Sequence, residues 1–379
     1  MKVVILGTAY PYRGGLAAFN QRLAEEYISM GHEVVIHTFS LQYPSFLFPG
    51  KTQYSDEPAP EGLTIKRTVN AINPLNWLRT GRRIKREEQP DLLIVKFWLP
   101  FMAPCLGTIC RIVKRGGRTR VVSVLDNVIP HEKRPGDKLF ARYFVRSVDG
   151  FVAMSRSVLS DLGLFDQQKP RAFCPHPLYD HYGAIMPRRE AVAAIGLNES
   201  ERYVLFFGFI RDYKGLDLLI DAFADHRLFD LGVKLIVAGE FYGDPEPYMS
   251  KIRSLDLADR IMLCTDFIPD SEVNRYFCAA DIVAQPYRSA TQSGVTQIAF
   301  HFETPMLVTN VGGLPEIVPD GKVGYVVEPD AQQIADALVR FYKEERHDEF
   351  VQNLRLEKQK YSWQNMTNAI DNLKTIKKK

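Results

Sequence analysis

The chain has 379 residues, of which 46% are hydrophobic and 25% charged, values typical of a soluble globular protein with two domains. No apolar run approaches the roughly 18 residues of a membrane-spanning helix, and the run after Met1 lacks a signal-peptide cleavage site, so we expect a first strand there. Five cysteines without a CxxC pair indicate reduced, mostly buried thiols in a cytoplasmic protein and argue against a cysteine metal site.

The two halves of the chain differ in charge although the net charge is only +3. Residues 1–190 contain 27 Lys and Arg against 17 Asp and Glu, whereas residues 191–379 contain 21 against 28. A basic first half fits a domain that meets an anionic surface or ligand, such as acidic lipid, phosphate or nucleic acid. An ordinary solvated surface explains the same charge equally well.

Apolar strands alternate with amphipathic helices through the first half. The first strand, residues 2–8, leads into a loop that contains Gly14 and Gly15, and a helix is predicted from Leu16 to Met30. The dinucleotide fingerprint GxGxxG is absent after this strand, so the loop is predicted to present backbone N–H groups to a ligand at the helix start. Further strands are predicted at residues 33–39, 91–97, 120–125 and 151–154.

Two segments between these strands have an unusual composition. Residues 40–62 are rich in proline, serine and aromatic residues without a period, which predicts a long exposed loop of functional or mobile character. The stretch from Asn76 to Gln89 is predicted to be helical and fits contact with a membrane surface, although a solvated basic face is the commoner meaning. Its basic residues are Arg79, Arg82, Arg83, Lys85 and Arg86.

The second half repeats the alternation. Residues 170–189, rich in proline and tyrosine, are interpreted as the interdomain connection. The whole pattern predicts an α/β protein with two doubly wound parallel sheets that face each other across a cleft. The predicted domains are residues 1–175 and 190–355, and a C-terminal helix over residues 360–379 is expected to pack back on the first domain.

The ligand-binding signal is clearest at residues 285–294. An apolar strand at residues 281–284 ends there in a turn of small polar residues, and a helix follows from Val295. A helix N-terminus carries unsatisfied N–H donors and a partial positive charge, which suits a phosphate. Taken alone, the same stretch is compatible with an ordinary βαβ unit that binds nothing.

Several stretches resemble the retaining glycosyltransferases of family 4, which have the GT-B fold. The matching stretches are residues 207–216, 235–240, 279–286 and 312–318, with Asp320, Gly321, Gly324 and residues 361–363, and more weakly Gly14 and Gly15. The resemblance covers most of the chain. It is strong across residues 200–330 and weak across residues 40–120, where the acceptor is expected to bind in this family.

The resemblance implies a nucleotide-diphosphate sugar donor, held mainly by the second domain, with no metal and no further cofactor. The implied phosphate-binding residues are Gly14, Gly15, Arg211, Lys214, Ser293 and Gly294. Those implied for the donor sugar and nucleotide are Gly239, Glu240, Phe267, Ile268, Thr291, Gln292, Gln297 and Glu316. Cations beside the diphosphate would stabilise the charge that builds on it as it leaves.

The chain departs from the family pattern at two places. The family usually carries two glutamates separated by seven residues, and here Thr291 and Ala299 stand at those positions. Leu125 stands where the family has a histidine beside Asp126, and His131 is expected to fill part of that role. Asp126 and His131 are therefore the candidate catalytic residues, while uncharged groups at residues 291–293 are able to bind sugar hydroxyls.

The leading hypothesis is a hexosyltransferase-type enzyme that moves a sugar, with retention, to a saccharide or lipid-linked acceptor in cell-surface polysaccharide biosynthesis. It is expected in the cytoplasm, with peripheral contact to the inner face of the membrane through the basic first domain. The alternative is a non-catalytic GT-B-shaped protein that binds a nucleotide or a partner, as the absent glutamates suggest. Three other classes are excluded by motifs that the chain lacks. It has no GxGxxG motif of a dehydrogenase and no carboxylate pair of a glycoside hydrolase. It also has no interleaved basic and aromatic residues of a nucleic-acid-binding protein.

Overall fold

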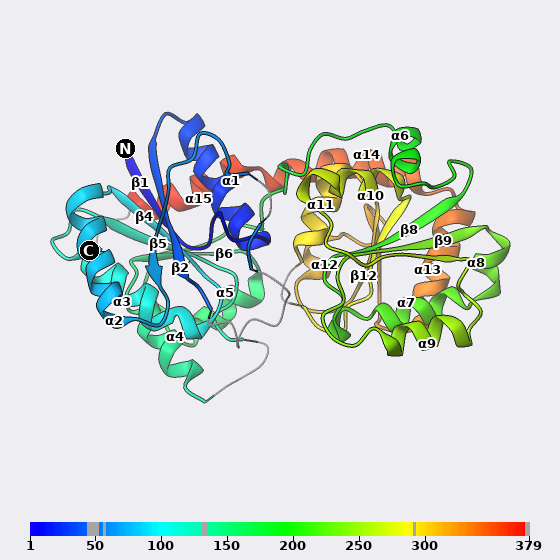
Figure 1. The fold of residues 1–379 in the computed structure, drawn as a ribbon, viewed down its shortest axis with the longest axis horizontal. Helices are drawn as coiled ribbons and strands as arrows, with labels where there is room; N and C mark the ends of the chain where they lie inside the picture. Colours follow the sequence, from blue (N-terminus) through cyan, green and yellow to red (C-terminus); the bar gives the residue numbers. More distant parts are fainter. Residues whose placement is uncertain (44–52, 56–57, 131–134, 291–292, 376–379) are drawn as a thin grey trace. The chain divides into compact units, whose positions relative to one another are not determined.

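The chain folds into two compact units, each built on one parallel sheet with helices on both faces (Figure 1). The computed structural model describes residues 1–43, 53–55, 58–130, 135–290 and 293–375. The first unit comprises Met1–Pro177 and Ser362–Lys379, and the second Leu178–Tyr361. The predicted fold class, two doubly wound α/β domains, is confirmed.

The first unit contains a seven-stranded sheet in the order β3-β2-β1-β4-β5-β6-β7. Its strands are β1 (Lys2–Leu6), β2 (Glu33–Leu41), β3 (Ile65–Asn70), β4 (Leu92–Phe97), β5 (Arg120–Leu125), β6 (Gly150–Ala153) and β7 (Arg171–Phe173). Every neighbouring pair is parallel, so all the strands end at the same edge. The central strands are buried on both faces, which accounts for their continuous apolar sequences.

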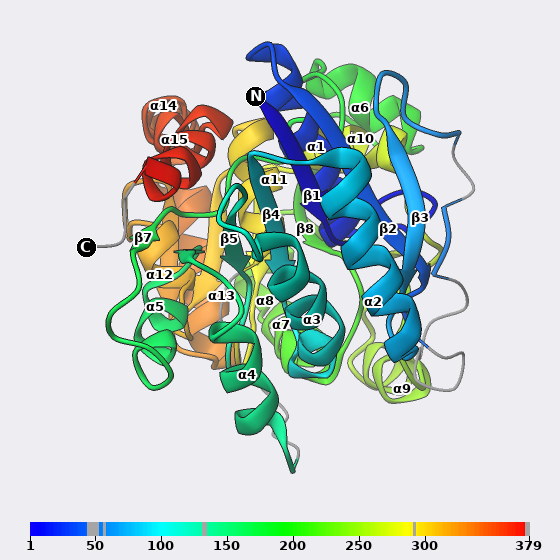
Figure 2. The ribbon, with the colours of Figure 1, turned by 90° about the vertical axis from the view of Figure 1, so that its left-hand side faces the viewer.

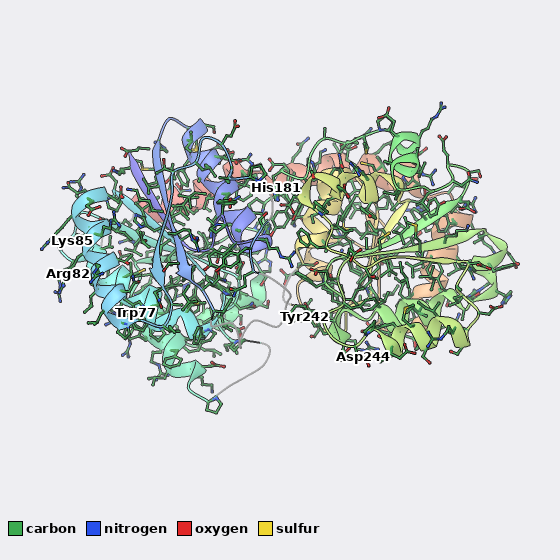
Figure 3. All side chains as sticks on the ribbon, viewed as in Figure 1. Trp77, Arg82, Lys85, His181, Tyr242 and Asp244 are labelled. Carbon is green, nitrogen blue, oxygen red and sulfur yellow. The ribbon has the colours of Figure 1, made fainter. Side chains whose placement is uncertain are left out.

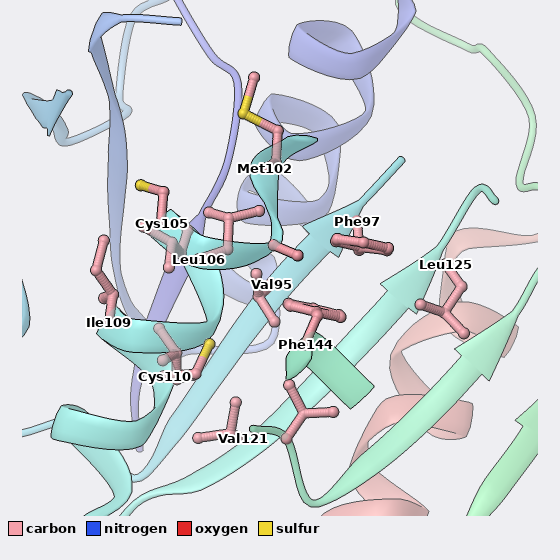
Figure 4. Packing of buried hydrophobic residues seen from close by; sticks show 14 of the residues in the cluster. Val95, Phe97, Met102, Cys105, Leu106, Ile109, Cys110, Val121, Leu125 and Phe144 are labelled. Atoms are coloured by element: carbon pink, nitrogen blue, oxygen red, sulfur yellow. The ribbon is translucent and has the colours of Figure 1, made fainter. Parts of the chain in front are cut away.

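One face of this sheet is covered by three helices that lie side by side (Figure 2). They are α2 (Pro74–Arg83), α3 (Ala103–Lys114) and α4 (Asp137–Val145), with short turns η2 (Ile84–Glu88) and η3 (Pro100–Met102) beside them and α5 (Arg156–Gly163) further along the chain. Figure 4 shows apolar side chains of α3 packed on β4 and β5. The rings of Phe97 and Phe144 stack there with centroids 3.9 Å apart.

The other face is covered by α1 (Gly15–Ser29) and by the last helix of the chain, α15 (Trp363–Thr375). The ring centroids of Phe19 and Trp363 lie 5.1 Å apart, and Met366 and Ile370 are fully buried in the same cluster. Each such apolar side chain contributes about 1.5–3 kcal/mol through burial. The last helix is therefore part of the core of the first unit, although it follows the second unit in sequence.

The second unit contains a six-stranded parallel sheet in the order β10-β9-β8-β11-β12-β13. Its strands are β8 (Arg202–Phe207), β9 (Val233–Ala238), β10 (Ile261–Cys264), β11 (Ile282–Gln285), β12 (Met306–Thr309) and β13 (Gly324–Val327). Its helices are α6 (Arg188–Ala194), α7 (Leu216–Phe223), α8 (His226–Asp230), α9 (Glu246–Ser254), α10 (Val273–Ala279), α11 (Gly294–Phe302), α12 (Leu314–Ile317), α13 (Ala331–Lys343) and α14 (His347–Glu357), with turns η4 (Asp212–Lys214), η5 (Asp270–Glu272) and η6 (Lys358–Tyr361).

Three local features differ from the sequence-based expectation. Strand β7 lies inside residues 170–189, which we expected to be irregular, and it extends the first sheet beside β6. Strand β3 was not expected, because only Val69 of its six residues is buried and its sequence lacks an apolar run. Strand β2 continues to Leu41, so the predicted loop at residues 40–62 begins later than expected, and its residues 44–52 and 56–57 lie outside the described residues.

None of the helices within the described ranges is long and apolar enough to cross a membrane.

The placement of α15 predicts that its buried residues stabilise the first unit. All three tryptophans, Trp77, Trp98 and Trp363, lie in that unit, so tryptophan fluorescence reports its unfolding. Ile370→Ala is expected to lower the free energy of unfolding by about 2–5 kcal/mol in urea titrations, because it leaves a cavity. Asn368→Ala, on the exposed side of the same helix, should change it by less than about 0.5 kcal/mol. Equal effects of the two substitutions would contradict this placement.

Candidate functional site

The candidate donor site lies at the edge of the second sheet where its strands end. Because all six strands are parallel, the loops after β8 to β12 emerge at this one edge, which is where open α/β sheets bind ligands. The predicted residues occupy these loops as follows: Arg211 and Lys214 follow β8, Gly239 and Glu240 follow β9, Phe267 and Ile268 follow β10, Ser293, Gly294 and Gln297 follow β11, and Glu316 follows β12. Thr291 and Gln292 lie outside the described residues.

Glycines let the first of these loops pack backbone against backbone. Gly208 and Gly239 have φ angles of +93° and +139°, and a Cβ on Gly239 would lie 2.5 Å from the carbonyl oxygen of Gly208. Gly215 has φ +68°, and a Cβ there would lie 2.0 Å from the carbonyl oxygen of Pro286. The Ile210 N–H donates to Glu240 O at 2.8 Å, which continues the pairing of β8 and β9 beyond the strands. The loops are therefore fixed by main-chain contacts that no larger residue permits.

Arg211 is held by an aromatic ring, and it forms no ion pair with a carboxylate of the described residues. Its guanidinium carbon lies 3.8 Å from the ring centroid of Tyr242, a residue in the loop after β9. Phe209 contacts the same tyrosine ring edge-on. A cation over an aromatic face is oriented while it keeps its full charge and its hydrogen-bond donors. This arrangement leaves Arg211 able to bind an anion.

Lys214 is enclosed near the start of α11. Its ammonium lies 5.6 Å from the ring centroid of Tyr287 and 3.1 Å from the point that a Cβ on Gly208 would occupy. Burial and, to a smaller extent, the positive charge of Arg211 together lower the pKa of Lys214 to about 8. A buried cation beside another cation is stabilised when an anion arrives between them. Lys214 is thus prepared for a ligand of strong negative charge.

The turn that carries Arg211 and Lys214 is held in place by Arg288, a residue in the loop after β11. Arg288 donates to both carboxylate oxygens of Asp217, at 2.7 and 2.6 Å, and to the carbonyl oxygen of Asp212 at 2.9 Å. Its own backbone N–H donates to Tyr213 O at 2.7 Å. A bidentate pair of this kind fixes orientation as well as distance. Arg288 therefore ties the loop after β11 to the Arg211–Gly215 turn.

The N-terminus of α11 lies beside the same turn. Val295 Cγ2 lies 3.9 Å from the point that a Cβ on Gly208 would occupy. Ser293 caps the helix by accepting from Val295 N at 3.2 Å, and its hydroxyl is 3.4 Å from that of Tyr287. Gly294 packs so closely on Tyr179 that a Cβ would lie 2.9 Å from its ring. The helix start thus adds main-chain donors and partial positive charge to the two cations.

Two buried glutamines lie on the elements that flank this turn. Gln285 ends β11 and Gln297 lies in the first part of α11, with side chains 1% and 0% exposed. Neither amide oxygen nor amide nitrogen of these side chains has a hydrogen-bond partner among the described residues. An unpaired buried amide costs about 1–3 kcal/mol, so both are able to gain from a polar ligand. Ala299, at the position of the family's second glutamate, is fully buried and apolar.

The remaining predicted residues belong to the first unit and are described by themselves. Gly14, with φ +96°, begins α1 without a side-chain cap, and a Cβ there would have no neighbour within 4 Å. Gly15 is the first residue of that helix. His131 lies outside the described residues.

Asp126 follows β5 and forms a buried ion pair with Lys96. Its carboxylate oxygen Oδ1 lies 3.0 Å from Lys96 Nζ, and Lys96 is 2% exposed. The same ammonium lies 3.3 Å from the ring centroid of Phe19, on α1. Burial raises the pKa of Asp126 and lowers that of Lys96, although each partner acts in the opposite direction. An aspartate held in this way is a candidate for proton exchange or for orienting a hydroxyl.

The site in the second unit brings together groups that suit a diphosphate. It combines two cations, a helix N-terminus and uncharged amides. In the part of the chain that the structure describes, no group of three or more His, Cys, Asp or Glu side chains is arranged to hold a metal ion.

Comparisons with known proteins match both units to glycosyltransferases. The model described as "Glycosyl transferases group 1" matches residues 201–344, and that described as "Glycosyl transferase 4-like domain" matches residues 14–172. A solved structure of HepE from Anabaena in complex with UDP-glucose superposes with a TM-score of 0.72 at 15% identity, covering 98% of each chain. The chain has the GT-B fold.

Curated relatives of this GT-B chain point the same way. D-inositol 3-phosphate glycosyltransferase of Segniliparus rotundus is 36% identical over 141 residues, which cover 36% of this chain and 31% of that protein. The chain thus spans about a third of the length of that relative. N-acetyl-α-D-glucosaminyl L-malate synthase of Bacillus anthracis is 22% identical over 91% of this chain and 89% of its own length.

Sequence reasoning missed several residues that contact the candidate site residues of each unit. Lys96 had a visible signal, because it is the one charged residue inside an otherwise apolar strand. Tyr242 and Tyr287 had none, since their contacts with the two cations join loops that are distant in sequence. Gly208 and Gly215 stood inside a motif already noted, but their tight backbone contacts are visible only in the fold.

The tight contact at Gly215 predicts that replacing this glycine by alanine strongly lowers the free energy of unfolding. Gly215→Ala and Gly232→Ala both place alanine at a φ near +65°, which costs about 1–2 kcal/mol, but a Cβ on Gly232 meets nothing within 4 Å. Gly215→Ala is expected to cost at least about 2 kcal/mol more, because the methyl group collides with Pro286. Urea unfolding followed by circular dichroism, with tryptophan fluorescence recorded in parallel to identify the first unit, measures the difference. Equal destabilisation by the two substitutions would rule out the close contact.

Proposed function

We propose that the chain is a glycosyltransferase that takes a nucleotide-diphosphate sugar and transfers the sugar, with retention and without a metal, to a saccharide or lipid-linked acceptor. The observation that carries the proposal is the turn bearing Arg211 and Lys214, which close glycine contacts fix against the loops after β9 and β11. The names of the matching models and relatives support glycosyl transfer. The HepE complex with UDP-glucose supports a nucleotide sugar as donor.

In the proposed reaction the bond between the anomeric carbon and the diphosphate oxygen breaks while the acceptor oxygen bonds to the same carbon from the same face. The acceptor proton passes to the departing diphosphate oxygen. Arg211, Lys214 and the N–H groups of α11 stabilise the charge that develops there, so no carboxylate nucleophile is required. The same positive groups supply the role for which other enzymes use a metal.

The nucleoside and the sugar are assigned to the neighbouring loops. The base is placed near Gly239, Glu240 and the exposed ring of Phe267, which offers a face for stacking. We assign the ribose contact to Gln297, because its buried amide lacks a partner among the described residues and the family's glutamate position is Ala299. Glu316, one strand further along the sheet edge, is assigned to the donor sugar together with Thr291 and Gln292.

Asp126 is proposed to act on the acceptor, with Lys96 as its positioning residue. The ammonium of Lys96 fixes one carboxylate oxygen, and Phe19 fixes the ammonium. Transfer of a hexose in cell-surface polysaccharide synthesis remains the proposed biological role.

The lowered pKa of Lys214 predicts that donor binding weakens in mild alkali. Below pH 8 Lys214 is protonated and pairs with the diphosphate, whereas above its pKa of about 8 the free protein must first take up a proton to do so. The association constant should therefore fall up to about tenfold per pH unit above pH 8. Calorimetric titration with whichever of UDP-, GDP- and ADP-glucose binds tightest measures this profile.

Lys214→Arg provides the matched control, because arginine stays charged throughout this pH range. Its profile should be flat, and Arg211→Ala should weaken binding at every pH. Exposed Arg189, in the same unit, should be replaceable by alanine without effect. Identical pH profiles for the wild type and Lys214→Arg would refute the role given to Lys214.

A further inference from the structure

The outer face of α2 and η2 combines exposed apolar and basic side chains. Leu75 is 75% exposed and Leu78 37% exposed, and Ile72, just before the helix, is 49% exposed. Four cations on the same segment are also exposed: Arg79, Arg82, Lys85 and Arg86. Figure 3 shows Arg82 and Lys85 projecting outward from this segment. Exposed leucines that cluster among arginines indicate an interaction surface.

The inner face of α2 explains why these side chains point outward. Gly81 packs so tightly on α3 that a Cβ would lie 3.0 Å from the side chain of Ile112. Thr80 and Ile84 are buried beside it. The close approach of the two helices fixes the rotation of α2, so the opposite face is held toward solvent. The exposed leucines and arginines are thus presented by a rigid element.

The cations on this face are not neutralised locally. Within the described ranges, Arg79, Arg82, Lys85 and Arg86 form no ion pair, while Arg83 pairs with Glu87 at 2.9 Å. The other acidic residue of the segment, Glu88, is buried and pairs with Lys2 and Lys66 instead. Leu75, Leu78 and the arginines line a shallow surface groove together. The groove is therefore both strongly positive and partly apolar.

The neighbouring helices α3 and α4 also carry exposed basic side chains, and α4 carries exposed apolar ones. Exposed cations on α3 and on the turn after it are Arg111, Arg115 and Arg118, and those on and just after α4 are Lys138, Arg142 and Arg146. Leu139 is 66% and Phe140 38% exposed on α4. Because α2, α3 and α4 lie side by side (Figure 2), these residues belong to one broad face of the first unit.

We propose that the face formed by α2, η2, α3 and α4 docks on the surface of an anionic lipid bilayer. Basic side chains meet the lipid phosphates, and Leu75, Leu78 and Leu139 enter the boundary between headgroups and acyl chains. Charge complementarity favours an anionic partner, and the exposed leucines favour lipid over nucleic acid, which offers phosphates but no apolar layer. This surface is distinct from the Arg211–Lys214 turn, so the inference stands or falls independently of the proposed donor.

The test is flotation of the full chain with vesicles of phosphatidylcholine alone or with about a third of phosphatidylglycerol. Binding is expected only to the anionic vesicles and should decrease as salt shortens the range of the attraction. Arg82→Gln/Arg86→Gln should lower the partition coefficient about 25-fold, roughly fivefold for each charge. Leu75→Asn/Leu78→Asn should weaken binding at high salt more than at low salt, because it removes the apolar contribution.

The matched control is Arg189→Gln/Lys343→Gln, which removes two exposed cations from the second unit and should leave binding unchanged. Thermal unfolding of every variant confirms that the fold is intact. Equal binding to neutral vesicles, no binding at low salt, or equal loss in the control variant would overturn the proposal. So would tighter binding to a short nucleic-acid duplex than to the anionic vesicles.

Discussion

The donor site depends on how closely the backbone loops at the end of the second sheet approach one another. Gly208 meets Gly239, and Gly215 meets the carbonyl group of Pro286, at distances that leave no room for a Cβ. These contacts bring the loops after β8, β9 and β11 into one layer, so residues that are distant in sequence lie within a few ångströms of one another. The position of Arg211 over Tyr242 and of Lys214 beside α11 follows from that layer.

Both units contain a cation that packs against an aromatic ring. In each unit an aromatic ring holds a cation: Phe19 holds the buried Lys96 in the first unit, and Tyr242 holds the partly buried Arg211 in the second. In the first unit Asp126 supplies the opposing charge, and burial acts against ionisation of both partners. In the second unit burial and the neighbouring charge of Arg211 lower the pKa of Lys214, so a negatively charged ligand would supply the opposing charge.

The sequence predicted those parts of the molecule that depend on local pattern. Apolar runs such as that of β4 predict buried parallel strands, and their alternation with helices predicts two doubly wound domains. Strand β3 escaped prediction because its sequence is half polar, and the pairing of Arg211 with Tyr242 escaped because it joins two loops. We expected the C-terminal helix to pack on the first domain, but the side-chain contacts between α1 and α15 join the two ends of the chain and cannot be named from local pattern.

The most direct test of the donor site is hydrogen exchange, followed by mass spectrometry, with and without a nucleotide sugar that binds. The account predicts slower exchange of backbone amides in residues 208–216, 239–245 and 293–297, and loss of this protection in Arg211→Ala. Measurable binding without protection of these three segments, or with protection confined to the first unit, would contradict the assignment of the donor to the second unit.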